Sequence, residues 1–127
     1  MKNQYDITKA QVLKALNFLK TIPARKWIKR EQTLNFDPKN IGKFHCAIGH
    51  LVVNPTSPFY KKNHVSFSGA CANVKDNDKV FGIRLHRLCC AITGRYLGDV
   101  NNDPKLIGQK TPRAASLKLL KQVYKEM

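Results

Sequence analysis

The sequence predicts a mainly α-helical protein in which residues 1–127 form one basic domain of about four helices. Apolar residues recur at helical spacing in four stretches of the chain, and recognisable start and stop signals bound most of these stretches. A length of 127 residues suits a single hydrophobic core. Two short segments, residues 32–36 and 64–68, are candidates for a small two-stranded β element.

The first and last helices have the clearest boundaries. Thr8 and Gln11 form the pattern of a capping box, which predicts a helix over about residues 8–21. Thr111 followed by Pro112 is typical of an N-cap with proline at the first helical position, and helical spacing continues from there to the end of the sequence. Both helices are therefore predicted with defined starting residues.

Two further helices are expected between them. Apolar spacing predicts one over about residues 42–53, where small residues indicate that another element packs closely against it. A second is expected from Asp78, as N-cap, to Gly94, as a left-handed C-cap. Residues 54–77 carry prolines and polar residues and are predicted to be a long loop.

The chain is strongly basic. It has 23 Lys and Arg residues against 8 Asp and Glu residues, a formal charge of +15, which exceeds the magnitude of about 2–8 that solubility needs. Most carboxylates fall at predicted helix starts or in turns, where they satisfy backbone N–H groups: Asp6, Asp37, Asp78, Asp99 and Asp103. The exposed helix faces are then largely cationic, which favours a polyanionic partner and excludes an acidic DNA mimic.

Composition also bears on compartment and cofactors. No apolar run approaches the roughly 18–20 residues of a membrane helix, and the N-terminus has no apolar signal segment, so we expect a cytoplasmic protein with no membrane partner. We accordingly expect free thiols at the four cysteines, Cys46, Cys71, Cys89 and Cys90. Without paired ligand spacing we expect no metal and no cofactor.

The first candidate phosphate-binding group surrounds the single tryptophan. Arg25, Lys26, Lys29 and Arg30 flank Trp27, and cations beside an aromatic residue are typical of nucleic-acid-binding segments. Trp27 itself could stack on an unpaired base, but burial in the core is favoured because large aromatic residues usually anchor cores. The four cations remain the phosphate-binding candidates.

Two other basic groups lie on predicted helices. Arg84, Arg87 and Arg95, with His86 beside them, form the second candidate group, because guanidinium groups bind phosphate oxygens well. An ordinary solvated helix face explains this second group equally well. A third stripe on the last helix is more typical of a solvated face and comprises Lys118, Lys121 and Lys125.

Other motifs predict no chemistry. Residues 99–103 superficially match a calcium loop, but Pro104 and Lys110 occupy the positions that require glycine and glutamate, so a capping turn is expected. The sequence contains no phosphate-binding glycine loop, and no cysteine is paired with a basic partner in a recognisable catalytic pattern. We therefore expect a binding protein and not an enzyme.

Three segments together resemble a known family. A Trp-x-Lys motif at Trp27, a Cys-Ala-Ile-Gly-x-Leu helix from Cys46, and an Asn-Asp turn at Asn102 before the last helix are similar to a family of small uncharacterised bacterial and phage proteins, a domain of unknown function. The resemblance implies a shared fold and core but no activity. This chain departs from the family in having Arg30 and Glu31 where a glycine is usual, and in its higher charge.

These observations leave three hypotheses in order of preference. The first is a small basic protein that binds nucleic acid or another phosphate-bearing polyanion. The second is a phage-type interaction protein that binds and modulates a host protein, in which the loop at residues 54–77 would matter most. The third is an enzyme that uses a cysteine or histidine.

Overall fold

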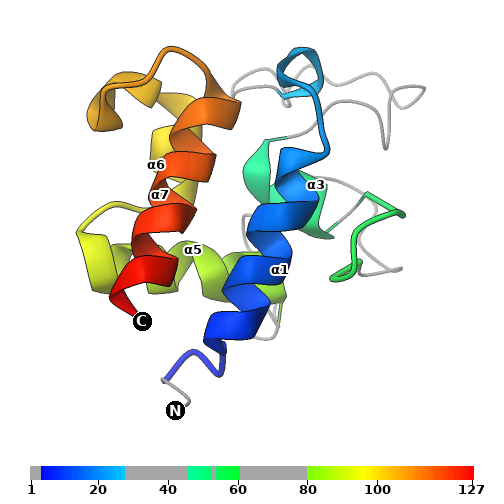
Figure 1. The fold of residues 1–127 in the computed structure, drawn as a ribbon, viewed down its shortest axis with the longest axis vertical. Coiled ribbons are helices and arrows are strands. Elements are labelled where there is room, and N and C mark those ends of the chain that lie inside the picture. The colour runs from blue at the N-terminus through cyan, green and yellow to red at the C-terminus, as the bar shows by residue number, and fades with distance from the viewer. Residues whose placement is uncertain (1–3, 28–45, 53, 61–79) are drawn as a thin grey trace.

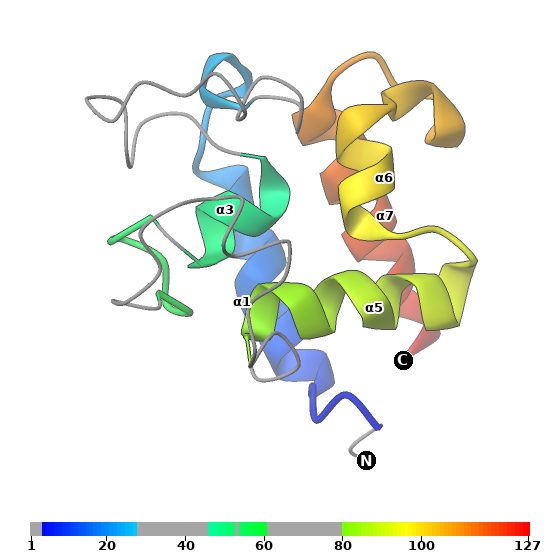
Figure 2. The ribbon, with the colours of Figure 1, turned by 180° about the vertical axis from the view of Figure 1, so that it is seen from behind.

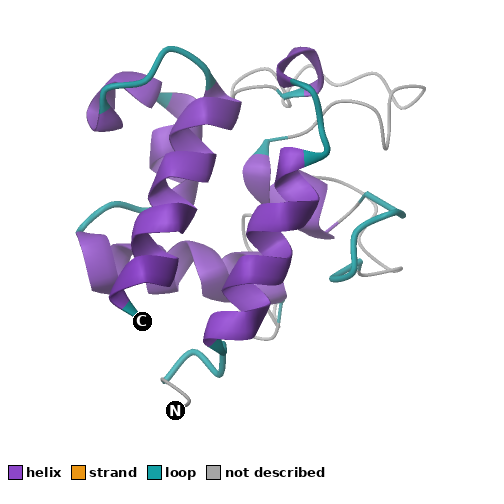
Figure 3. Cartoon of the chain, viewed as in Figure 1, coloured by secondary structure: helices purple, strands orange, loops and turns teal. Residues whose placement is uncertain are grey.

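The computed structural model describes residues 4–27, 46–52, 54–60 and 80–127. These residues are mainly helical and contain no strand, which confirms the predicted helical class (Figure 3). The segments predicted to form a β element, residues 32–36 and 64–68, lie outside them. In chain order the elements are α1 (Lys9–Lys20), the 3-10 helix η1 (Ala24–Lys26), α3 (Ala47–Val52), α5 (Phe81–Thr93), α6 (Leu97–Asn102), the 3-10 helix η4 (Pro104–Ile107) and α7 (Pro112–Glu126).

Two long helices dominate one side of the molecule. Figure 1 shows α1 and α7 side by side and running in opposite directions, with α5 crossing near the start of α1 and the end of α7. Seen from behind, α3 and α6 stand above α5 (Figure 2), and α5 contacts both of them. None of the described helices is long and apolar enough to cross a membrane.

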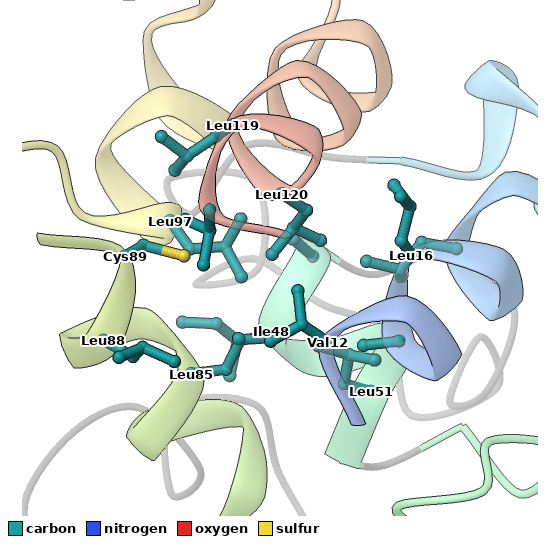
Figure 4. Packing of buried hydrophobic residues seen from close by; sticks show 14 of the residues in the cluster. Val12, Leu16, Ile48, Leu51, Leu85, Leu88, Cys89, Leu97, Leu119 and Leu120 are labelled. Carbon is teal, nitrogen blue, oxygen red and sulfur yellow. The ribbon is translucent and has the colours of Figure 1, made fainter. Parts of the chain in front are cut away.

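The described helices share one hydrophobic cluster. Figure 4 shows Leu16 of α1, Leu51 of α3, Leu85 of α5, Leu97 of α6 and Leu120 of α7 directed toward one another. All five are at most 3% exposed. Burial of apolar side chains from every α-helix is the main force that fixes their relative positions.

The predicted caps of the outer helices are confirmed. Thr8 Oγ1 accepts a hydrogen bond from Gln11 N at 3.1 Å, and Gln11 Oε1 accepts one from Thr8 N at 2.9 Å, which completes the capping box. Thr111 Oγ1 accepts from Ala114 N at 3.1 Å and so caps α7. Gly94 ends α5 with a left-handed φ of 81°, as predicted.

Other boundaries differ from the predicted ones. α5 begins at Phe81 with Val80 as its N-cap, so the prediction of Asp78 as N-cap was wrong. Within the residues described, α3 covers Ala47–Val52, and the predicted start of this helix near residue 42 lies outside them.

The predicted turn at residues 99–103 was also wrong. Asp99 to Asn102 belong to α6, and Asp103 is its C-cap. Glycine, aspartate and asparagine are poor helix formers, which is why the sequence favoured a turn. In the structure Asn101 is fully buried and its Oδ1 accepts a hydrogen bond from Ala47 N at 3.0 Å, at the start of α3. Tertiary contact thus outweighs local preference here.

α3 and α5 approach each other closely at Gly82. A Cβ atom at Gly82 would lie 2.6 Å from Val52 Cγ2 and 3.1 Å from Ile48 Cγ2. Only glycine allows this separation without displacing α3. The sequence-based expectation of a closely packed neighbour for this helix is met by α5.

Candidate nucleic-acid interface

The segment after α1 exposes two cations on a rigid base. Arg25 and Lys26 are exposed on η1, while Trp27 is only 5% exposed and its Nε1 donates a hydrogen bond to Ile22 O at 3.1 Å. The ring of buried His50 lies 5.2 Å from the Trp27 ring, and its Nε2 is 3.0 Å from Lys26 O. The predicted burial of Trp27 is therefore confirmed, and this residue anchors η1 instead of stacking on a base.

Arg84, from the second predicted group, serves the fold. Its Nη1 donates to Tyr5 O and to Asp6 O, each at 3.0 Å, and its guanidinium lies 5.8 Å from the centre of the Phe81 ring. Asp6 has a left-handed φ of 53°, which is unfavourable for a residue with a side chain. Arg84 binds the two carbonyls around this strained position, so we leave it out of the candidate interface.

The other predicted site residues do not form one cluster. Arg87 and Arg95 are exposed at the α5 end of the molecule, and Lys29 and Arg30 lie outside the described residues. η1 follows the end of α1, whereas α5 crosses near its start, so the two predicted groups stand at opposite ends of α1 (Figures 1 and 2). The structure thus separates the first predicted group from the second.

The pairing of α1 with α7 creates a cationic surface that neither helix has alone. At one end, Arg113 Nε donates to Ile22 O at 3.0 Å and its Nη2 donates to Lys20 O at 2.8 Å. At the other end, Lys9 Nζ lies 4.7 Å from the centre of the Tyr124 ring. These contacts join the start of each helix to the end of the other and fix the antiparallel pair.

Lysines from both helices line the seam of this pair. Lys20 follows Lys9 by three helical turns and therefore lies on the same side of α1. Lys121 and Lys125, one turn apart and both exposed, flank Tyr124 on α7. With the two cations of η1, which lies beyond the end of α1 and contacts α7, they form what we call the α1–α7 cationic face: Lys9, Lys20, Arg25, Lys26, Lys121 and Lys125.

Carboxylates are nearly excluded from this surface. α1 contains none, and the only one on α7 is Glu126 in its last turn. Lys118, which belongs to the predicted third stripe, is used within the fold, because its Nζ donates to Ile107 O at 3.0 Å. The α1–α7 cationic face consequently has almost no internal neutralisation.

Sequence reasoning missed this face because it assessed each helix separately. The lysines of α1 and α7 each match an ordinary solvated stripe. A usable signal was present, since both helices lack acidic residues apart from Glu126. Their antiparallel pairing, however, depends on contacts across more than 90 residues of sequence, such as that between Arg113 and Ile22.

The cysteines show no catalytic arrangement in the described residues. Cys46 is buried at the start of α3, where its Sγ accepts from Gly49 N at 3.5 Å, and Cys89 is buried in the core. Burial raises the pKa of the Cys89 thiol well above its usual range, so it stays protonated and unreactive. Cys90 is half-buried and also free, and the described residues include no group of three or more side chains that could hold a metal ion.

Comparison with protein-family models, with curated proteins and with solved structures finds no match to this chain. The resemblance to small bacterial and phage proteins, carried by Trp27, Cys46 and Asn102, stays a prediction.

Proposed function

We propose that this protein binds nucleic acid, or another phosphate-bearing polyanion, through the α1–α7 cationic face. The observation that carries the proposal is the joining of two helices, almost free of carboxylates, into one lysine-lined surface. The folded chain sets six cations along it, including Arg25 and Lys26 from the first predicted group.

The dimensions of the face suit a phosphate backbone. The twelve residues of α1 span about 18 Å at the usual helical rise, which matches several successive phosphates of a nucleic acid strand. Two cations about 10 Å apart in water repel each other by only about 0.4 kcal/mol, so the fold tolerates the face without a ligand. A polyanion removes this repulsion and releases its own counterions, which is the larger driving force.

Such binding depends steeply on salt. Each phosphate neutralised on a single strand contributes about −0.7 to the slope of log K against log salt concentration. If all six cations contact phosphates, the slope is about −4, and affinity falls by roughly 300-fold between 50 and 200 mM salt.

The test is a fluorescence polarisation titration with labelled single-stranded DNA, single-stranded RNA, duplex DNA and inorganic polyphosphate at several salt concentrations. The double variant Lys121→Gln/Lys125→Gln removes two cations from the face. We expect it to reduce the slope by about 1.4 and to weaken binding roughly ten- to thirtyfold near 0.1 M salt.

The matched control is Lys14→Gln/Lys105→Gln. It changes the net charge equally at two other exposed lysines, Lys14 on the far side of α1 and Lys105 on η4. Equal weakening by both double variants would contradict the assignment of the face, and no binding to any probe at 50 mM salt would contradict the proposed function. Capture of one stoichiometric protein that survives nuclease treatment is instead the outcome expected for the rival hypothesis, a modulator of a host protein.

A further inference from the structure

A second feature lies where α5 turns into α6. Tyr96 is 40% exposed, although one side of its ring is stacked on His86, with ring centroids 4.7 Å apart and an interplanar angle of 24°. An aromatic residue with this exposure leaves its outer ring face open to a planar ligand. We call the residues involved the α5–α6 corner: His86, Arg87, Arg95 and Tyr96.

Backbone contacts hold this stack in place. Gly98 N donates to His86 Nδ1 at 2.9 Å, so the imidazole is neutral, with its proton on Nε2, and cannot rotate freely. A Cβ at Gly98 would lie 3.0 Å from His86 Cε1, which shows how closely the backbone supports the imidazole. The Tyr96 ring therefore rests on a fixed layer.

The polypeptide on either side of Tyr96 is equally constrained. Thr93 Oγ1 accepts from Arg95 N at 3.1 Å, which orders the connection between the helices. A hydrogen bond with the Cys90 side chain raises the pKa of Tyr96, so its hydroxyl stays protonated at neutral pH. The ring is thus preorganised, and a ligand that stacks on it loses little affinity to ordering the protein.

Cations flank the same corner. Arg95 precedes Tyr96 directly, and Arg87 follows His86 on α5; both are exposed. Asp99 also lies near Tyr96 and contributes to its raised pKa, which disfavours a phosphate at the hydroxyl edge of the ring. A phosphate group is therefore expected on the Arg95 side.

We propose that the α5–α6 corner is a stacking site for one unpaired nucleobase, whose neighbouring phosphate contacts Arg95, and that the bound nucleic acid is accordingly single-stranded. The inference rests on the proposed function and specifies its ligand. An exposed aromatic beside cations is the arrangement by which proteins bind single strands without sequence preference, because every base has an aromatic face. Bases within a duplex are stacked on one another and cannot occupy this position.

The corner and the α1–α7 cationic face can serve one strand. α5 packs against α7, and the C-terminal ends of both helices lie at the same end of the molecule (Figures 1 and 2). Lys121 and Lys125 are on the part of α7 nearest that end. A strand that leaves the lysines of α7 can reach Arg95 and Tyr96.

The experiment compares two oligonucleotides with equal numbers of phosphates, an oligothymidylate and an abasic chain of the same length. Wild-type protein is expected to prefer the oligothymidylate. Tyr96→Leu is expected to weaken oligothymidylate binding roughly 5- to 100-fold, while leaving the affinity for the abasic chain and the salt slope unchanged. Tyr96→Phe keeps the ring and should retain the preference, and Arg95→Gln should weaken both probes while leaving their ratio unchanged.

The matched control is Tyr60→Leu, since Tyr60 is 41% exposed and lies away from both proposed surfaces, in the turn after α3. Emission of buried Trp27 checks that each variant is folded. An equal wild-type affinity for the two probes, or an unchanged preference in a folded Tyr96→Leu variant, would overturn the stacking site alone. If the wild type binds neither probe at low salt, the proposed function fails with it.

Discussion

Asn101 Oδ1 accepts a hydrogen bond from Ala47 N at 3.0 Å, so a side chain on α6 caps the start of α3 from 54 residues away in sequence. The N–H groups at the start of a helix have no partner within it and must be satisfied by other groups. Most N-caps come from the adjacent residue. Here a fully buried amide supplies part of the cap and ties two short helices together.

Asn101→Ala should therefore destabilise the protein by about 1–3 kcal/mol, because it leaves a buried N–H without an acceptor. Urea unfolding followed by Trp27 emission measures the change. The control Asn17→Ala, at an exposed position of α1, should alter the free energy of unfolding by less than about 0.5 kcal/mol. Equal stability of the two variants would show that the contact between Asn101 and Ala47 contributes little.

Gly82→Ala should also destabilise the protein, against the trend of helix propensity. Alanine is favoured over glycine in a helix by about 1 kcal/mol. The added methyl group would lie 2.6 Å from Val52 Cγ2, and overpacking of this kind costs about 1–3 kcal/mol. In a Val52→Ala background the clash is relieved, so the same substitution should cost less, and a double-mutant cycle measures the difference. Additive effects would contradict the close approach of α3 and α5.

Arg113→Lys should lower the free energy of unfolding by about 1–2 kcal/mol, because an ammonium cannot reproduce the two guanidinium hydrogen bonds to Lys20 O and Ile22 O. The half-buried position of Arg113 keeps the expected loss at the lower end for charged hydrogen bonds. Lys121→Met provides the control, since Lys121 is exposed on the same helix. A loss no larger than that of the control would mean that shape alone pairs α1 with α7.

Alkylation should distinguish Cys89 from Cys90. Burial holds the pKa of Cys89 far above its usual value, so iodoacetamide should leave it unmodified until the protein unfolds, while half-buried Cys90 reacts faster. Peptide mapping by mass spectrometry at pH 7 and pH 9 provides the measurement. Because this thiol can ionise only in the unfolded chain, its contribution to stability should be lost as the pH rises above about 9. Native labelling of Cys89 at the rate of Cys90 would contradict the burial.

Local signals predicted the parts of the fold that local interactions determine. The caps at Thr8 and Thr111 involve partners three residues away, and the left-handed end of α5 needs only Gly94. Trp27 was expected in the core on its size alone. α6 escaped prediction because its helical state depends on burial of Asn101 against α3, which no local pattern contains.

The candidate sites show the same division. The charge of the chain and the basic residues at Arg25 and Lys26 are visible in the sequence. That Arg84 and Arg113 bind main-chain carbonyls, and that the lysines of α1 and α7 share one surface, follows only from the packing of distant segments. Residue type alone does not distinguish an arginine that supports the fold from one that is available to a ligand.

The Ile22 carbonyl accepts hydrogen bonds from both Trp27 Nε1 and Arg113 Nε. One donor is five residues away and the other is 91 residues away. During synthesis on the ribosome, the segment that contains Ile22 emerges long before α7, so this node cannot be completed while the chain is growing. α1 and η1 therefore wait for α7 to emerge, and assembly of this part of the protein is expected to follow translation and to be slowed by long-range contacts.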